Sequence, residues 1–321
     1  MNKRFTAGLL IFIVFVVLVG LLARQLLVGL RGEDGFPGRG GRVALVYVEG
    51  TITGDSEPSS SILLGPGASS VVTVEMLERA RKDSDIRAVV LRVNSPGGSA
   101  AASHEVYEEI ERVVAEKPLV VSMGDMCASG GYYISSPASY IYASPSTMTG
   151  SIGVIWSSYD LSGLLESYGV RSNTLTAGEF KDIGSTARQM KGNERVMLQQ
   201  MLDQVHDQFI AAVAAGRKLK EEEVRKLATG MIYTGQTAVE LKLVDELGGL
   251  EAAKAKAREL AGLPEDAKVV AYERRRSVFD VFNLLGASFS GNAPVARALE
   301  PPSALEIIAR RLLLHDIGQL N

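Results

Sequence analysis

The stretch from Met126 to Tyr133 constrains the fold more than any other part of this sequence. It reads Met-Cys-Ala-Ser-Gly-Gly-Tyr-Tyr and follows a run of strand-forming residues at 118–124. A serine between small residues and a Gly-Gly pair therefore stands where a strand turns into a helix. Small neighbours let the backbone of a ligand come close, and glycines leave amide N–H groups free to donate. Ser129 is thus a candidate nucleophile beside an oxyanion hole, although a plain helix N-cap has the same pattern.

A second strand–glycine–helix unit lies directly upstream. Residues 86–93 are mostly apolar, as in a buried parallel strand, and Asn-Ser-Pro-Gly-Gly-Ser follows them at 94–99, before a predicted helix. The carboxyl ends of neighbouring parallel strands meet at one edge of an open α/β sheet, where ligands bind. We therefore expect Gly97 and Gly98 to lie close to Ser129.

Composition excludes several classes of function. The chain has 321 residues and a net charge of -3, without the basic excess that a nucleic-acid partner would favour. Its single cysteine, Cys127, rules out an intrachain disulfide and a cysteine metal cluster. The three histidines have no metal-binding spacing, so neither a metal nor a cofactor is predicted. Glycine-punctuated strands that alternate with helices are typical of an α/β fold.

The amino-terminal segment predicts a membrane anchor. Residues 5–23 are almost entirely apolar, close to the roughly 20 residues that a helix needs to cross a bilayer core. Lys3 and Arg4 precede this segment and no small-residue cleavage site follows it, which favours an uncleaved signal-anchor over a removed signal peptide. A buried core helix is the weaker alternative, because the segment has no polar face. Arginines on its far side leave the topology open by charge alone.

A nucleophilic serine needs a base, and histidine is the usual one. No motif surrounds His104, His206 or His315, and His104, which follows the glycine loop, is the histidine alternative. A lysine can serve instead when desolvation lowers its pKa. Lys181, in Glu-Phe-Lys-Asp-Ile-Gly-Ser after a predicted strand at 172–176, is a candidate. Spacing alone does not distinguish it from a solvated surface lysine.

Four motifs together resemble those of the signal peptide peptidase A family of serine proteases, in its short bacterial form. They are Asn-Ser-Pro-Gly-Gly, Ser-Met-Gly-Asp-Met-Cys-Ala-Ser-Gly-Gly-Tyr-Tyr, Thr-Gly-Ser-Ile-Gly-Val-Ile and Glu-Phe-Lys-Asp-Ile-Gly-Ser, in this order. The resemblance covers most of residues 43–260. It implies the α/β fold of the Clp protease and crotonase superfamily, with repeated ββα units and here an N-terminal transmembrane helix. It also implies a Ser–Lys dyad that needs no histidine, metal or cofactor.

The resemblance carries over to individual positions. It implies Ser129 as the nucleophile, Lys181 as the general base, Ser151 as the residue that orients the lysine amine, and Gly97, Gly98 and Gly130 as the oxyanion region. Cys127 departs from the family pattern, in which small residues such as alanine are common here, and we expect it to be a packing residue.

The resemblance also implies an organisation and a substrate class. The expected regions are a cytoplasmic stub and signal-anchor at 1–30, a flexible linker at 31–42, a peptidase domain at 43–285 and a C-terminal extension at 286–321. The expected protein is a homo-oligomeric serine endopeptidase, anchored in the cell membrane by a single pass with its catalytic domain outside the cytoplasm. Its expected substrates are signal-peptide remnants and other apolar, extended peptides.

Two alternatives remain at this point. A crotonase-type acyl-CoA enzyme would share the fold, but the predicted anchor argues against it. A catalytically idle, membrane-anchored peptide-binding scaffold would not require Ser129, Lys181 and Ser151 together.

Overall fold

The computed structural model describes residues 41–55, 60–61 and 65–272. The predicted signal-anchor at 5–23, all but the last residues of the predicted linker, and the extension at 286–321 lie outside the described residues. Among the helices that the structure describes, none combines the length and the apolar character needed to cross a membrane.

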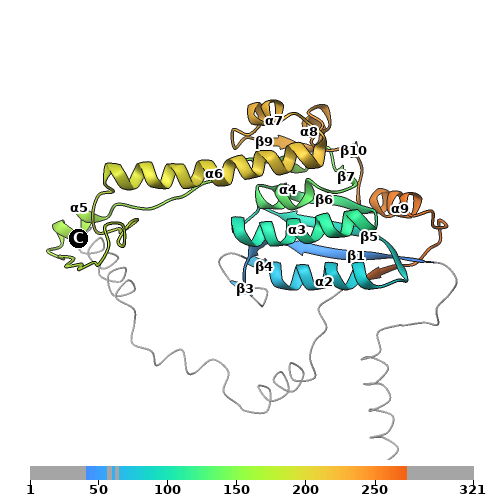
Figure 1. The fold of residues 1–321 in the computed structure, drawn as a ribbon, viewed down its shortest axis with the longest axis horizontal. Helices are drawn as coiled ribbons and strands as arrows, with labels where there is room; N and C mark the ends of the chain where they lie inside the picture. The colour runs from blue at the N-terminus through green and yellow to red at the C-terminus, as the bar shows by residue number, and fades with distance from the viewer. Residues whose placement is uncertain (1–40, 56–59, 62–64, 273–321) are drawn as a thin grey trace, which may run out of the picture. The chain divides into compact units, whose positions relative to one another are not determined.

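A largely parallel sheet forms the centre of the fold (Figure 1). Its main strands are β1 (Arg42–Glu49), β5 (Ile86–Ser95), β6 (Leu119–Ala128), β7 (Tyr140–Ala143), β10 (Glu246–Leu247) and β11 (Val269–Ala271). They lie in the order β10-β7-β6-β5-β1-β11, and every neighbouring pair is parallel. Beyond β7, β8 (Met148–Gly150) pairs with the end of β6, and β9 (Ile232–Thr234) pairs antiparallel with β8. The predicted α/β class, with a parallel-rich sheet, is therefore confirmed.

Helices and a small second sheet complete the described chain. The helices are α2 (Ser70–Lys82), α3 (Ala100–Glu116), α4 (Gly130–Ser135), α5 (Ser162–Ser167), α6 (Gly192–Arg217), α7 (Glu221–Leu227), α8 (Gly235–Glu240) and α9 (Leu250–Leu260). The small sheet joins β2 (Thr51–Thr53), β3 (Ser60–Ser61) and β4 (Gly65–Ser69). The helix predicted after the glycine loop is α3, and it begins where the Ser99 hydroxyl accepts a hydrogen bond from the Ala102 N–H at 3.3 Å.

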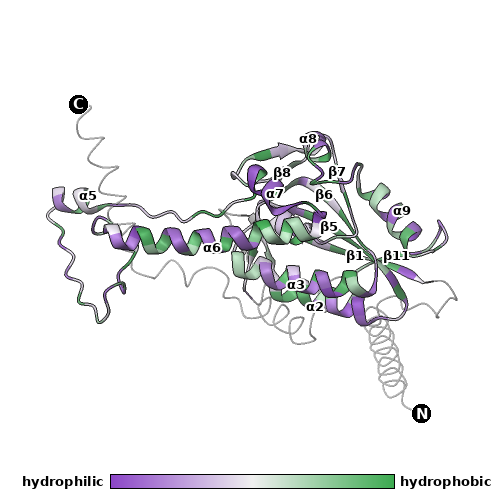
Figure 2. Cartoon of the chain, turned by 45° about the horizontal axis from the view of Figure 1, so that its top comes forward, coloured by the Kyte–Doolittle hydropathy of each residue, from purple (hydrophilic) through white to green (hydrophobic). Residues whose placement is uncertain are grey.

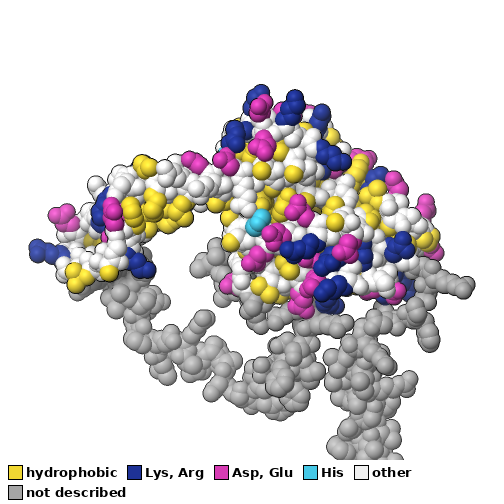
Figure 3. Space-filling model, in the orientation of Figure 1, with side chains coloured by type: hydrophobic (Ala, Val, Ile, Leu, Met, Phe, Trp, Pro, Cys, Tyr) yellow, Lys and Arg dark blue, Asp and Glu magenta, His cyan; other side chains and the backbone are white. Residues whose placement is uncertain are grey.

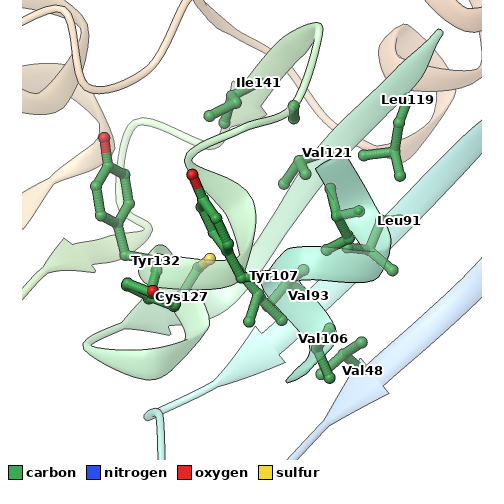
Figure 4. Close-up of a cluster of buried hydrophobic side chains, with 14 of the residues drawn as sticks. Val48, Leu91, Val93, Val106, Tyr107, Leu119, Val121, Cys127, Tyr132 and Ile141 are labelled. Atoms are coloured by element: carbon green, nitrogen blue, oxygen red, sulfur yellow. The ribbon is translucent and has the colours of Figure 1, made fainter. Parts of the chain in front are cut away.

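Side chains alternate between two hydrophobic layers along each central strand. On β1, Ala44 and Val46 belong to the layer beneath α2, α3, α4 and the end of α6, whereas Val43 and Leu45 belong to the layer covered by α9. Figure 4 shows part of the first layer, where Leu91 and Val121 of neighbouring strands lie among helix residues. Because both faces are covered, the strands are nearly continuous apolar runs. That pattern made β5 and β6 recognisable in the sequence.

A long, irregular segment, residues 155–190, separates β8 from α6; we call it the arm. Its only helix among these residues is α5, and most of its side chains are exposed. The strand predicted at 172–176 is not formed, and Leu175 at its centre is 99% exposed. A strand needs a neighbour to pair with and a layer to pack against, and this part of the arm has neither.

The arm joins the outer end of α6, which extends past the sheet (Figure 1). α6 has 26 residues, about 39 Å at the usual helical rise. Phe209, Ile210 and Val213 near its end are buried in the core, whereas Val196 and Met201 in its outer half are exposed. Figure 2 shows hydrophobic and hydrophilic bands along α6, and Figure 3 shows hydrophobic side chains gathered beneath its outer half and on the arm.

Candidate active site

Ser129 occupies a strained turn between β6 and α4. Its backbone has φ 51° and ψ -123°, a region that residues other than glycine rarely adopt, at a cost on the order of 1–3 kcal/mol. The turn is fixed from both sides, because the Ser129 N–H donates to Gly150 O at 2.9 Å and Ser129 O accepts from the Tyr133 N–H at 2.8 Å. The side chain makes no capping hydrogen bond. The N-cap alternative therefore does not explain this serine.

The loop after β5 packs directly against this turn. A Cβ added at Gly97, whose φ is 101°, would lie 2.7 Å from Gly130 N and 2.8 Å from the Cβ of Ser129. Both distances are shorter than real Cβ contacts, so only glycine fits at this position. Ile52 holds the loop in place: its N–H donates to Gly97 O and its carbonyl accepts from the Ser99 N–H, both at 2.9 Å.

Two backbone N–H groups remain available beside Ser129. Ile52 is hydrogen-bonded to Gly97 and Ser99, the residues on either side of Gly98, so the Gly98 N–H takes no part in this bridge. The Gly130 N–H is the first of α4 and has no acceptor within the helix. By contrast, the Gly97 N–H donates to Ser95 Oγ at 3.1 Å. Gly98 and Gly130 thus offer the pair of donors that a developing oxyanion requires.

Replacing Gly97 with alanine is expected to disrupt this arrangement. The new methyl group would push the loop away from Ser129 and Gly130, and we expect kcat/KM to fall by about 10²-fold, as for the loss of one oxyanion donor. Peptide hydrolysis and thermal unfolding would measure the effect. Gly249→Ala, off the arm at the start of α9, is the matched control, because a Cβ at Gly249 meets no atom within 4 Å. Equal activity of the two variants would contradict a role for this loop.

Ser151 lies next to this turn, at the end of β8. It follows Gly150, which accepts the Ser129 N–H, and its own N–H donates to Met231 O at 2.8 Å. Its φ of 50° is again unusual for a residue other than glycine. The structure therefore places Ser151 next to the turn that carries Ser129.

Lys181 lies elsewhere, exposed on the arm. The arm is tied to the start of α6 by the ion pair between Arg188 and Glu194. Phe209, the first α6 residue of the buried core cluster, is 15 positions after Glu194, which corresponds to about 22 Å along the helix. Within one chain the structure does not bring Lys181 to Ser129 or Ser151.

The histidine alternative finds no geometric support. His104 Nδ1 lies 2.9 Å from Tyr133 Oη and 3.1 Å from Gln208 Nε2, and its Nε2 lies 3.5 Å from a Glu108 carboxylate oxygen. These contacts account for both ring nitrogens, and no described hydrogen bond joins His104 to Ser129. His315 lies beyond the described residues.

Cys127 is a packing residue in this structure. Its side chain is fully buried, with Sγ 3.3 Å from Gly131 O and from Ser135 Oγ. Burial raises the pKa of the Cys127 thiol to about 12. The thiol therefore stays protonated at neutral pH, where only a thiolate would be an effective nucleophile.

Two features of the site were not identified from the sequence. The Ser103 hydroxyl, on α3, is buried without a hydrogen-bond partner among the described residues, and it lies 2.5 Å from where a Cβ of Gly130 would be. It explains why position 130 is a glycine. On the arm, Arg188 contacts both Asp182 and Glu194. The only sequence signal for that cluster is a basic residue six positions from an acidic one on either side.

Comparison with known proteins identifies the family. The family model described as Peptidase family S49 matches residues 111–264, which contain Ser129, Ser151 and Lys181. "Protease 4" of Salmonella typhi is 40% identical over 227 residues, 70% of this chain but only 36% of that protein. The "Putative protease" of Methanocaldococcus jannaschii is 33% identical over 282 residues, 87% of this chain and 90% of that protein. The "Putative signal peptide peptidase SppA" of Enterococcus faecium is 37% identical over 204 residues, 63% of this chain and 59% of that protein. The chain therefore belongs to peptidase family S49 and is a serine peptidase.

Proposed function

We propose that this protein is a serine endopeptidase that uses Ser129 as its nucleophile and Lys181 as its general base. The observation that carries the proposal is the strained turn at Ser129, whose side chain is free of capping and lies beside the Gly98 and Gly130 N–H groups. A turn that costs free energy and presents an unused hydroxyl next to two free donors is typical of a nucleophile. Family membership gives the reaction class.

The mechanism follows from these positions. The neutral amine of Lys181 takes the proton from Ser129 Oγ as this oxygen attacks the peptide carbonyl carbon. The Gly98 and Gly130 N–H groups stabilise the oxyanion. When the tetrahedral intermediate collapses, the C–N bond breaks and the protonated lysine gives its proton to the leaving amine. Lys181 then deprotonates the water that hydrolyses the acyl-enzyme, and the Ser151 hydroxyl keeps the lysine amine oriented.

We propose that the lysine reaches this site from a second copy of the chain in a homo-oligomer. A lysine acts as a base near neutral pH only when it is desolvated, and Lys181 is exposed in the single chain. The arm also exposes Ile155 at 85%, Tyr159 at 76% and Leu164 at 50%. Exposed large hydrophobic side chains that gather on one part of a surface mark a protein interface. Packing against a neighbouring copy would cover these side chains and desolvate Lys181 in one step.

The remaining parts of the proposal rest on sequence. We propose the Clp protease and crotonase-like arrangement of repeated ββα units as the finer fold, and a single-pass anchor at 5–23 that holds the catalytic domain outside the cytoplasm. Signal-peptide remnants and similar apolar, extended peptides are the proposed substrates, and the name of the Enterococcus faecium relative, a putative signal peptide peptidase, supports them. No cofactor and no nucleic-acid partner are proposed. Membership of a peptidase family disfavours the acyl-CoA enzyme and the idle scaffold.

The test combines labelling with product analysis. The full chain, in detergent, is treated with a fluorophosphonate probe and digested, and mass spectrometry locates the adduct. We expect it on Ser129, and we expect an unlabelled sample to cut signal-peptide-like peptides within their apolar stretch. A folded protein that neither takes the label nor cuts such peptides would support the scaffold alternative instead.

A further inference from the structure

Three charged side chains form a compact cluster where the arm meets α6; we call it the arginine clamp. Arg188 Nε and Nη2 donate to the two carboxylate oxygens of Asp182, at 2.7 and 2.8 Å. Arg188 Nη1 and Nη2 also donate to the two carboxylate oxygens of Glu194, at 2.9 and 2.5 Å. A further bond runs from Nη2 to the backbone oxygen of Asp182, at 3.2 Å. One planar guanidinium group therefore bridges two carboxylates with paired bonds on both sides, which a lysine could not do.

The clamp is unlike an ordinary surface ion pair. The Glu194 side chain is fully buried, and its carboxylate also accepts the Lys191 N–H at 2.9 Å. Hydrogen bonds from Arg188 hold the pKa of Asp182 and the pKa of Glu194 below their usual values. Both acids therefore stay ionised at every pH above about 4, the ordinary range of free carboxyl groups. Ion pairs at exposed positions contribute little, whereas a buried carboxylate depends on its partner.

We infer that Arg188 is a positioning residue for the base, and this inference rests on the proposed role of Lys181. Asp182 directly follows Lys181, so the clamp fixes the chain at the residue next to the proposed base. Local bonds hold the turn itself, from the Ile183 N–H to Phe180 O at 3.1 Å and from the Ser185 N–H to Asp182 O at 3.0 Å. Besides the clamp, Asn193 Nδ2 on α6 donates to Glu179 Oε1 at 2.8 Å, but this bond is exposed. With so little regular structure in the arm, the clamp fixes this turn to α6 and thereby sets where Lys181 reaches.

The fluorescence of Trp156 can report whether this turn keeps its position. Trp156 is the single tryptophan of the chain, 45% exposed, and its ring lies 3.1 Å from where a Cβ of Gly184 would be. Gly184 is two residues after Asp182, so the fluorescence of Trp156 responds when the turn leaves its place. This readout does not depend on catalysis.

The experiment replaces Arg188 with alanine in the full chain. We expect kcat to fall by about 10²-fold, as for a reacting group displaced by about 1 Å, with a much smaller change in KM. We expect the Trp156 emission to shift to longer wavelength as the turn loosens. Guanidinium ions at millimolar concentration should restore part of both signals, because they replace the missing group. Arg188→Lys should be intermediate, since it keeps the charge but not the fork.

Two matched variants separate the possible causes. Arg225→Ala breaks an exposed ion pair, between Arg225 and Asp207 at 2.8 Å, and should change neither kcat nor the emission. Lys181→Ala should abolish activity and leave the emission unchanged. If Arg188→Ala does not fold, Asp182→Asn removes one side of the clamp and keeps the buried Arg188–Glu194 pair, with a smaller effect in the same direction.

The outcomes are distinct. A kcat within about twofold of the parent, or a loss of kcat without any change in Trp156 emission, would overturn the role of Arg188. If Lys181→Ala retained full activity while Arg188→Ala still shifted the emission, the clamp would hold the turn but Lys181 would not be the base. In that case the proposed function of Lys181 fails, and the positioning role fails with it.

Discussion

Ser129→Ala is expected to lower kcat/KM by about 10⁴-fold or more, because the acyl-enzyme can no longer form. The fold should survive, since the Ser129 side chain makes no capping hydrogen bond and the turn is held by backbone bonds to Gly150 and Tyr133. Ser129→Gly should be equally inactive but more stable than Ser129→Ala, because glycine adopts a φ of 51° without strain. Hydrolysis of a fluorogenic apolar peptide and thermal unfolding would give the two quantities.

The matched control for this prediction is Ser84→Ala, in the turn between α2 and β5. Ser84 is exposed and lies off the arm, so its replacement should leave activity unchanged. A Ser129→Ala protein with more than a tenth of the parent activity would show that another group attacks the substrate. Equal stability of the alanine and glycine variants would show that the turn stores no strain at Ser129.

The position of the glycine loop beside Ser129 could be predicted from the sequence because the signals for it are local. Apolar runs mark β5 and β6, and the glycines that follow them are required by close contacts, with the backbone N of Gly130 at Gly97 and with the Ser103 hydroxyl at Gly130. Two parallel neighbours then bring their carboxyl ends together, which places the glycine loop beside the serine. The sequence does not show which amide N–H is left without a hydrogen bond. That depends on Ile52 of β2, which bonds to Gly97 and Ser99 and leaves the Gly98 N–H unused.

The arm could not be predicted in the same way. Residues 172–176 have strand propensity, but propensity is realised only where a sheet edge accepts the strand, and none does here. The arginine clamp joins residues six positions apart in irregular chain, where no helical or strand period relates them. The distance between Lys181 and Ser129 is set by α6, because its outer half extends beyond the hydrophobic core and carries the arm with it. A motif order along the sequence contains no information about that distance.

Lys181→Ala is expected to lower kcat/KM by about 10³-fold or more, and the variant gives a test of where the lysine acts. Ser129→Ala and Lys181→Ala chains are each inactive alone. If the arm of one copy serves the serine of its neighbour, co-assembly of the two at equal amounts restores activity. About a quarter of the sites in a randomly mixed, symmetric oligomer then pair an intact Ser129 with an intact Lys181. Co-expression with two affinity tags and a peptide assay would measure the restored fraction.

A lack of restored activity would be equally informative, because a lysine from a neighbouring copy and a lysine from the same chain predict different restored fractions. If each chain supplied both groups to its own site, no site in the mixture would be complete and activity would stay at the level of the single variants. The arm would then have to fold back across the roughly 22 Å of α6 that separates Glu194 from Phe209. The exposed outer half of α6, with Val196 and Met201 facing solvent in the single chain, argues for a neighbouring copy at this surface. The expected result is therefore restoration to about a quarter, compared with about half when Gly249→Ala chains, which keep both groups, replace either variant.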